Sequence, residues 1–143
     1  MLHLQHTNFR HLSILVITTN KSVIIFRKGR YKMSKKILKN IDLSTILTLK
    51  DLVNYQPGQV VSKTLAQNNN VSLTLFAFDK EEEISTHSSH GDAMVYVIDG
   101  TGQFTIGDET YTLSEGQTIV MPSEVPHAVF APEQFKMFLI VVF

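Results

Sequence analysis

The sequence predicts an all-β fold, a β-sandwich or barrel, preceded by a short helical or irregular N-terminal segment. After residue 58, apolar and β-branched runs recur at short, regular intervals. Gly, Asn, Asp and Pro residues separate these runs, and no helical pattern interrupts them. The expected strands span 59–66, 71–78, 84–88, 93–98, 102–106, 109–113, 117–121, 127–131 and 135–143.

The segment before these strands has a different pattern. Apolar residues between Ile41 and Asn54 follow a mixed, loosely helical spacing, and Pro57-Gly58 ends it. We therefore expect an N-terminal arm with a short helix over 33–57, ahead of a β-domain at 58–143.

Length and composition narrow the class of protein. A chain of 143 residues is long enough for one domain with its own core. The chain has no Cys, which excludes disulfides, thiolate metal sites and a cysteine nucleophile. Because the sequence carries no adaptation to an oxidising compartment, we expect a cytoplasmic protein.

The formal net charge of zero is the sum of two unequal parts. Residues 1–32 hold six basic and no acidic groups, whereas residues 33–143 hold seven basic against 13 acidic groups, a net charge of −6. Met33-Ser34-Lys35-Lys36 resembles a natural start, so we expect 1–32 to be a basic extension outside the fold. The apolar runs at 12–17 and 23–26 are too short to span a membrane. An acidic domain repels phosphate, so we expect neither a nucleic-acid nor a membrane partner.

The histidines are the residues best suited to chemistry. No nucleophile elbow, phosphate-binding Gly-rich loop or HExxH helix is present. Three of the six His, namely His87, His90 and His127, lie in the acidic part. Imidazole is the commonest transition-metal ligand, and the strands of one small barrel can bring distant imidazoles together.

Two segments resemble the motifs of the cupin superfamily, in particular its small single-domain members. Residues 116–127 match the second motif, with Gly116, Pro122 and His127 in place, and Glu124 stands where the family has its inner Gly. Residues 93–100, ending in Asp99-Gly100, match the end of the first motif. The resemblance implies a double-stranded β-helix, the jelly-roll barrel of the cupins, over about 58–143.

The resemblance also implies a metal site, which this sequence matches only in part. Complete cupin sites hold a divalent metal with three His and one Glu, and His87 and His127 fall on two of these positions. Ser89 and Ala93 fall on the other two. His90 is a possible substitute, but residues three apart in a strand point to opposite faces unless a bulge intervenes. If Ala93 points into the barrel, Val95 and Val97 on the same face of the strand also point inward, and Tyr96 points outward.

Two kinds of function follow from the resemblance. One is a metal-dependent enzyme, dioxygenase-like or isomerase-like, using Fe, Mn, Ni, Zn or Cu on His87, His127 and His90. The other is a non-catalytic cupin, a sensor or carrier, that binds a small molecule in its barrel. The two imidazoles would then form a metal-free pair usable for hydrogen bonding or proton transfer.

The last predicted strand, 135–143, is apolar on both faces from Met137 onward. A strand covered on one side only should alternate between apolar and polar residues. We therefore expect a second cover for this strand and predict a homodimer.

Overall fold

The computed structural model of the chain describes residues 3–9, 12–19, 22–27 and 36–143. Residues 1–35 and 36–143 are two separate compact units. The first unit contains a three-stranded antiparallel sheet in the order β1-β2-β3, formed by His3–Phe9, Leu12–Thr19 and Ser22–Arg27. The two apolar runs noted in the sequence lie in β2 and β3, and the expected start at Met33 falls outside the described residues.

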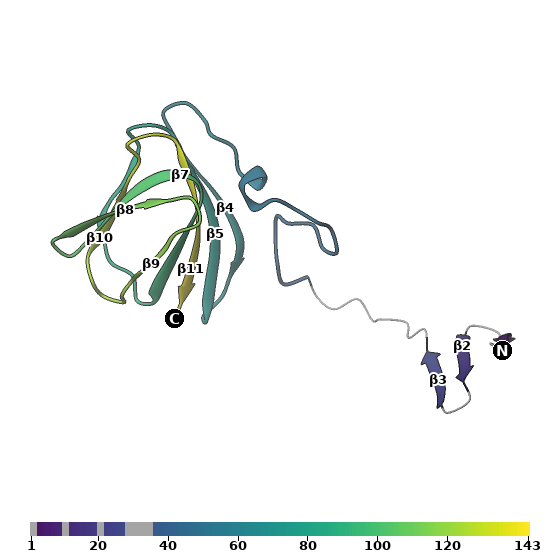
Figure 1. Cartoon of the computed structure of the whole chain (residues 1–143). Coiled ribbons are helices and arrows are strands. Elements are labelled where there is room, and N and C mark those ends of the chain that lie inside the picture. The colour runs from purple at the N-terminus through teal and green to yellow at the C-terminus, as the bar shows by residue number, and fades with distance from the viewer. Residues whose placement is uncertain (1–2, 10–11, 20–21, 28–35) are drawn as a thin grey trace. The chain divides into compact units, whose positions relative to one another are not determined.

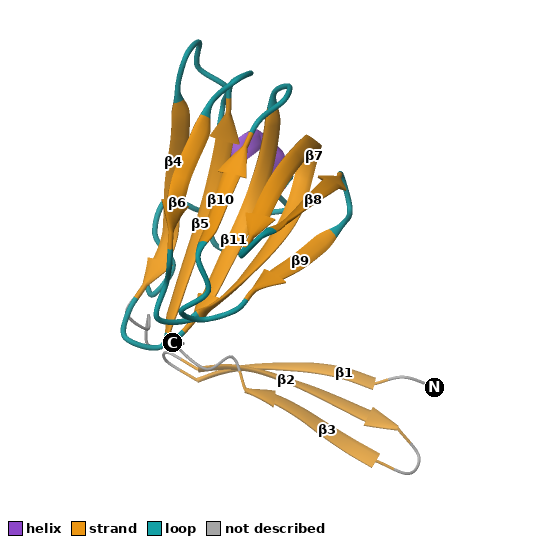
Figure 2. Ribbon diagram, turned by 90° about the vertical axis from the view of Figure 1, so that its left-hand side faces the viewer, coloured by secondary structure: helices purple, strands orange, loops and turns teal. Residues whose placement is uncertain are grey.

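The second unit is a curled antiparallel sheet (Figures 1 and 2). Its strands pair in the order β4-β5-β11-β7-β10-β6, and β8 and β9 also pair with β7. These strands are β4 (Val60–Gln67), β5 (Val71–Phe78), β6 (Glu83–His87), β7 (Asp92–Ile106), β8 (Glu109–Ser114), β9 (Thr118–Met121), β10 (His127–Phe130) and β11 (Phe135–Val142). The predicted all-β fold is confirmed.

Strand β7 joins the two sides of the barrel. Its first half pairs with β9 and β11, and its second half pairs with β8 and β10. The prediction of two separate strands, 93–98 and 102–106, is wrong in this respect. The chain stays extended through Gly100, whose φ of 72° bends the strand without ending it. A register shift against β11 at the same level accommodates the bend.

The inner face of the barrel is a closed apolar core. Ala93, Val95 and Val97 alternate inward along β7 and are fully or almost fully buried, whereas Tyr96 points outward, as expected. Deeper in the barrel Phe135 stacks on another buried ring with centroids 4.6 Å apart. Burial of each such side chain contributes about 1.5–3 kcal/mol, so this face holds the sheet in its curled form.

The arm that precedes β4 contains one helical turn, the 3-10 helix η1 (Leu49–Leu52). The sheet supplies hydrogen-bond partners for the arm's backbone. The Nζ of Lys63 donates to the Leu52 carbonyl at 2.8 Å, and the Nζ of Lys136 donates to the Lys50 carbonyl at 2.7 Å. These two backbone carbonyls of the arm therefore have hydrogen-bond partners in the sheet.

This arm covers part of the outer face of the sheet. Val53 of the arm is buried in a second core cluster with residues of β4, β5 and β7, and Phe138 of β11 packs against that cluster. The second apolar face of β11 is therefore partly covered by the chain itself. In the part of the chain that is described, no helix is long and apolar enough to cross a membrane.

Candidate functional site

Two of the predicted site residues meet at one end of the barrel. His87 ends β6, His127 begins β10, and the two residues are paired directly opposite each other. Their ring centroids are 4.5 Å apart, and the rings meet edge-on at 66°. His127 is 2% exposed, whereas His87 lies open to solvent at the rim.

Each ring is held by a backbone carbonyl two residues earlier in the chain. The Nδ1 of His87 lies 2.8 Å from the carbonyl oxygen of Ser85, and the Nδ1 of His127 lies 2.9 Å from that of Val125. A carbonyl oxygen can only accept a hydrogen bond, so Nδ1 carries the proton in both rings. In the neutral state each Nε2 therefore keeps a lone pair, which can accept a hydrogen bond or bind a metal ion.

Two loops place further residues at the same end of the barrel. Residues 88–91 connect His87 to the start of β7, and residues 122–126 connect the end of β9 at Met121 to His127. The loops are tied together, because the amide of Glu124 donates to the Ser89 carbonyl at 2.8 Å. Ala93 and Met121, which are paired across β7 and β9 next to these two loops, both belong to the apolar core.

His90 does not join this pair. Its side chain is 93% exposed, and its Nδ1 lies 2.6 Å from the Glu124 carboxylate. The bulge that would turn His90 inward is not seen, because residues 88–91 form a loop between β6 and β7. Ser89, at the family's second His position, donates its hydroxyl to the Gly91 carbonyl at 2.6 Å.

Glu124 has a backbone conformation that favours glycine. Its φ is 63°, in the left-handed region, where a side chain costs roughly 1–2 kcal/mol. This is the position at which the second cupin motif has its inner Gly, so the motif explains the conformation. In this chain a carboxylate occupies the position and reaches His90 instead.

The donor set falls short of a resident metal site. Within the described residues, no three His, Cys, Asp or Glu side chains are grouped so that they could hold a metal ion. Ala93, at the family's Glu position, is 2% exposed and brings no charge. Protein metal sites generally use three or four protein ligands, whereas this site has two neutral imidazoles. The arrangement is best suited to accepting hydrogen bonds.

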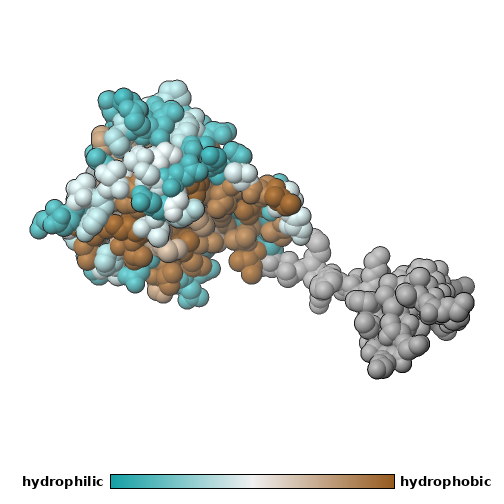
Figure 3. All heavy atoms as spheres, in the orientation of Figure 1, coloured by the Kyte–Doolittle hydropathy of each residue, from teal (hydrophilic) through white to brown (hydrophobic). Residues whose placement is uncertain are grey.

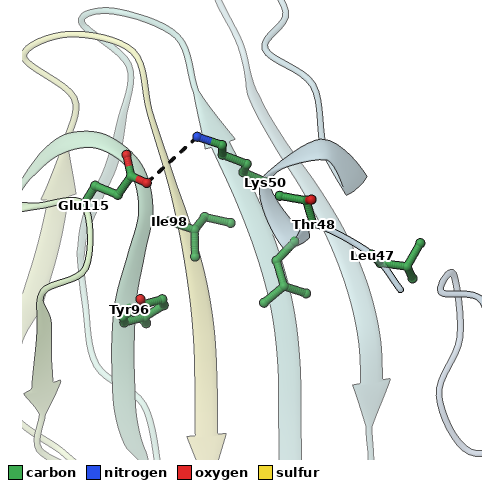
Figure 4. A pocket seen from close by; sticks show the side chains of 7 residues that line it. Leu47, Thr48, Lys50, Tyr96, Ile98 and Glu115 are labelled. Atoms are coloured by element: carbon green, nitrogen blue, oxygen red, sulfur yellow. Dashed lines mark ion pairs between the residues drawn. The ribbon is translucent and has the colours of Figure 1, made fainter. Parts of the chain in front are cut away.

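A separate pocket of about 360 Å³ lies on the outer face, between the arm and β7 (Figure 4). Its charged rim is Lys50, whose Nζ lies 3.5 Å from Asp99 and 3.9 Å from Glu115. No motif in the sequence predicts it, because the arm and β7 meet only in the folded chain. The pocket is lined by Leu47, Thr48, Leu49, Lys50, Tyr96, Ile98 and Glu115.

Electrostatic interactions hold the arm beside this pocket. The hydroxyl of Tyr55 donates to Asp99 at 2.7 Å. That hydrogen bond lowers the pKa of Asp99, and Lys50 and Lys136 add to the effect. Burial raises the pKa of Tyr55, and its hydrogen bond to Asp99 raises it further.

Comparison with known proteins agrees with this architecture. The family model "Cupin domain" matches residues 74–143. A conserved protein of unknown function from Streptococcus pyogenes is 44% identical, with a TM-score of 0.74. The match covers 76% of this chain and 96% of that one. No match is found among curated proteins.

Two further solved structures carry the family name. A cupin superfamily protein from Desulfitobacterium hafniense is 29% identical with a TM-score of 0.71, over 74% of this chain and 97% of that one. A cupin 2 conserved barrel domain protein from Leptotrichia buccalis is 38% identical with a TM-score of 0.67, over 68% of this chain and 47% of that one. The motifs, the curled antiparallel sheet and these matches lead to one conclusion: the chain belongs to the cupin superfamily, as one of its small members.

Proposed function

We propose that the chain is a small-ligand-binding cupin without a catalytic metal, and that His87 and His127 bind the ligand at the mouth of the barrel. One observation carries the proposal, namely that a backbone carbonyl fixes each Nδ1 as the protonated nitrogen. Both Nε2 atoms are then hydrogen-bond acceptors of fixed orientation. Two such acceptors side by side suit a ligand that donates hydrogen bonds.

The surroundings of the pair indicate the class of ligand. Ala93, Met121 and Ile106 belong to or pack against the apolar core at this end of the barrel. Val95 and Phe104 have no exposed surface, so the deeper barrel is filled. The ligand is therefore a small, partly hydrophobic molecule with a hydroxyl, amide or ammonium donor, and it binds near the rim.

The competing hypothesis is the metal-dependent enzyme, dioxygenase-like or isomerase-like, that the family resemblance implies. Both hypotheses assign the binding to the Nε2 lone pairs, because a metal ion and a hydrogen-bond donor would occupy the same lone pair. The site, however, has Ala93 where a carboxylate would neutralise and retain a divalent ion. The two hypotheses therefore differ in whether the site retains metal.

The test uses the full chain and four small probes. Phenol, benzamide and benzylamine each combine a benzene ring with one hydrogen-bond-donating group, namely a hydroxyl, an amide or an ammonium group, and toluene is the matched probe without a donor. We expect the three donors, but not toluene, to shift the NMR signals of residues around His87 and His127. Replacing either His with Phe keeps an aromatic ring but removes both ring nitrogens, including the Nε2 acceptor. We expect about fivefold weaker binding, because one hydrogen bond contributes about 1 kcal/mol.

His90→Phe is the matched control, because it removes an exposed imidazole that does not contact the pair. We expect it to leave probe binding unchanged. The proposal is wrong if the donor probes bind no better than toluene. It is also wrong if Zn²⁺ or Ni²⁺ binds stoichiometrically with submicromolar affinity in calorimetry and this binding is lost in both Phe variants, since that result identifies a metal site.

A further inference from the structure

We infer that Glu109 completes the ligand site at the mouth of the barrel, and that the ligand is a short organic cation with an ammonium group at one end and a hydrogen-bond donor at the other. The inference rests on the proposed function, because it adds a charged end to the ligand of His87 and His127. Two observations carry it, namely a row of paired residues across four strands and a backbone hydrogen bond that holds the two ends of this row together.

The row runs directly across four neighbouring strands. His87 of β6 is paired with His127 of β10. His127 is paired with Ile106 of β7, which is in turn paired with Glu109 of β8. Neighbouring strands lie about 4.8 Å apart, so the backbone of Glu109 lies roughly 10 Å from that of His127. Two imidazoles, an apolar side chain and a carboxylate therefore follow one another across the sheet.

Glu109 lies on the same face of the sheet as the two histidines. Residues two or four apart in a strand share a face, and Leu113, four residues after Glu109, belongs to the core of the barrel. Thr110 lies on the opposite face, where its hydroxyl is 3.1 Å from a threonine hydroxyl of β7. His127 is on the core side as well, because Val129 two residues later is a core residue. The carboxylate and the imidazoles therefore point to the inner side of the sheet.

The turn that precedes Glu109 is attached to the loop that precedes His127. A two-residue turn joins the end of β7 to the start of β8 at Glu109. The backbone amide of Gly107 in this turn donates to the Pro126 carbonyl at 2.8 Å. Because Pro126 comes directly before His127, this hydrogen bond limits how far the two ends of the row can move apart. The tip of this hairpin lies at the left of the barrel in Figure 1, and Figure 3 shows hydrophilic residues there.

The charge of Glu109 is available to a ligand. Glu109 is exposed, and the ion pairs found between described residues do not include it. A carboxylate beside two hydrogen-bond acceptors attracts a cation and repels an anion. Residues 33–143, with seven basic and 13 acidic groups and a net charge of −6, act in the same direction. These charges favour an ammonium group at this end of the ligand.

The residue between the two polar ends indicates the middle of the ligand. Ile106 is half-buried and packs against the apolar core of the barrel. It therefore offers an apolar surface between the imidazoles and the carboxylate. A benzene ring that carries a hydroxyl at one end and a two-carbon ammonium arm at the other matches this order of groups. Its hydroxyl would donate to an Nε2 atom of the histidine pair, its ring would pack on Ile106, and its ammonium group would reach Glu109.

The test compares two probes that differ only in the ammonium group, namely tyramine and 4-ethylphenol. We expect tyramine to bind the full chain about tenfold more tightly in NMR titrations at pH 7.5, because a hydrogen bond to a charged group contributes more than a neutral one. Glu109→Gln should reduce this advantage to less than twofold. Asp108→Asn is the matched control, because it removes the same charge from the neighbouring turn residue. We expect it to leave the advantage of tyramine unchanged.

The outcomes separate this inference from the proposed function. If neither probe shifts the NMR signals of residues around His87 and His127, the proposed function fails and the inference fails with it. If both probes bind at the histidines with equal affinity, the inference is wrong and the proposed function stands. Equal losses of tyramine affinity in Glu109→Gln and Asp108→Asn would also overturn the inference, because they would show only a general attraction of cations to the acidic domain.

Discussion

His87 and His127 face each other across β6 and β10, and each donates its Nδ1 proton to the carbonyl two residues earlier. The same hydrogen bond thus forms at the last residue of β6 and at the first residue of β10. It turns two flexible rings into fixed acceptors, because rotation of either ring would break its hydrogen bond. Backbone carbonyls therefore determine which ring nitrogen accepts hydrogen bonds at this site, and a side-chain motif contains no information on them.

The first prediction concerns the tautomer of these two rings. In the neutral form of both rings, the proton should lie on Nδ1, because each Nδ1 faces a backbone carbonyl oxygen. A long-range ¹H–¹⁵N correlation spectrum of the folded chain at high pH measures this directly. The same histidines in the urea-unfolded chain provide the reference, where no carbonyl is held in place. A proton on Nε2 of either ring would contradict the assignment.

The second prediction concerns the left-handed backbone of Glu124. Glu124→Gly should raise the free energy of unfolding by about 0.5–1 kcal/mol, because glycine adopts a φ of 63° without strain. The loss of the exposed contact with His90 subtracts little, since surface ion pairs contribute about 0–1 kcal/mol. Urea unfolding measures the change.

Glu124→Ala separates the two effects. Alanine loses the contact with His90 but keeps a Cβ in the left-handed conformation, so it should be no more stable than wild type. If Glu124→Gly and Glu124→Ala have the same stability, the backbone of Glu124 is not strained.

Strand positions followed from the sequence, because turn residues separate apolar runs in a period of two. The exception is β7, where the glycines of residues 99–102 look like a turn in sequence. In the structure Gly100 permits a bend and β11 continues the pairing on both sides of it. Whether a glycine ends a strand or bends it depends on the neighbouring strand, which is distant in sequence.

The sequence predicts the positions of the two histidines that a motif spaces, but not the position of the histidine that lies in a loop. His87 and His127 lie together as the cupin motifs imply. His90 was the possible third ligand, and its placement depends on the contact between two loops that are 34 residues apart. The carbonyls of Ser85 and Val125 carry no side-chain pattern, so the tautomer of the pair had no signature in the sequence.

The third prediction concerns the acid stability of the contact between the arm and the barrel. The hydrogen bond from Tyr55, with help from Lys50 and Lys136, lowers the pKa of Asp99 below its ordinary value of about 3.9. A lowered pKa means that the folded state favours the ionised form. The stability from Asp99 is therefore fully present above about pH 4 and is lost as the pH falls through its folded pKa.

Asp99→Asn tests this pH dependence. The difference in the free energy of unfolding between wild type and Asp99→Asn should be largest near neutral pH and should shrink below about pH 4. Tyr55→Phe should narrow the pH range over which the stability from Asp99 is lost, because it removes the largest cause of the lowered pKa of Asp99. A difference that stays constant from pH 7 to pH 3 would show that the charge of Asp99 does not hold the arm.

The fourth prediction concerns the contact between Gly102 and Phe135. A Cβ at Gly102 would lie 2.6–2.9 Å from atoms of the Phe135 ring. The Phe135 ring cannot move away from Gly102, because it stacks on Phe78 and packs edge-on against Phe104. Gly102→Ala should therefore cost about 1–3 kcal/mol in urea unfolding. Phe135→Leu removes the obstructing atoms, so the double variant should lose about 1 kcal/mol less than the two single changes added together. Additive losses would place the strain elsewhere.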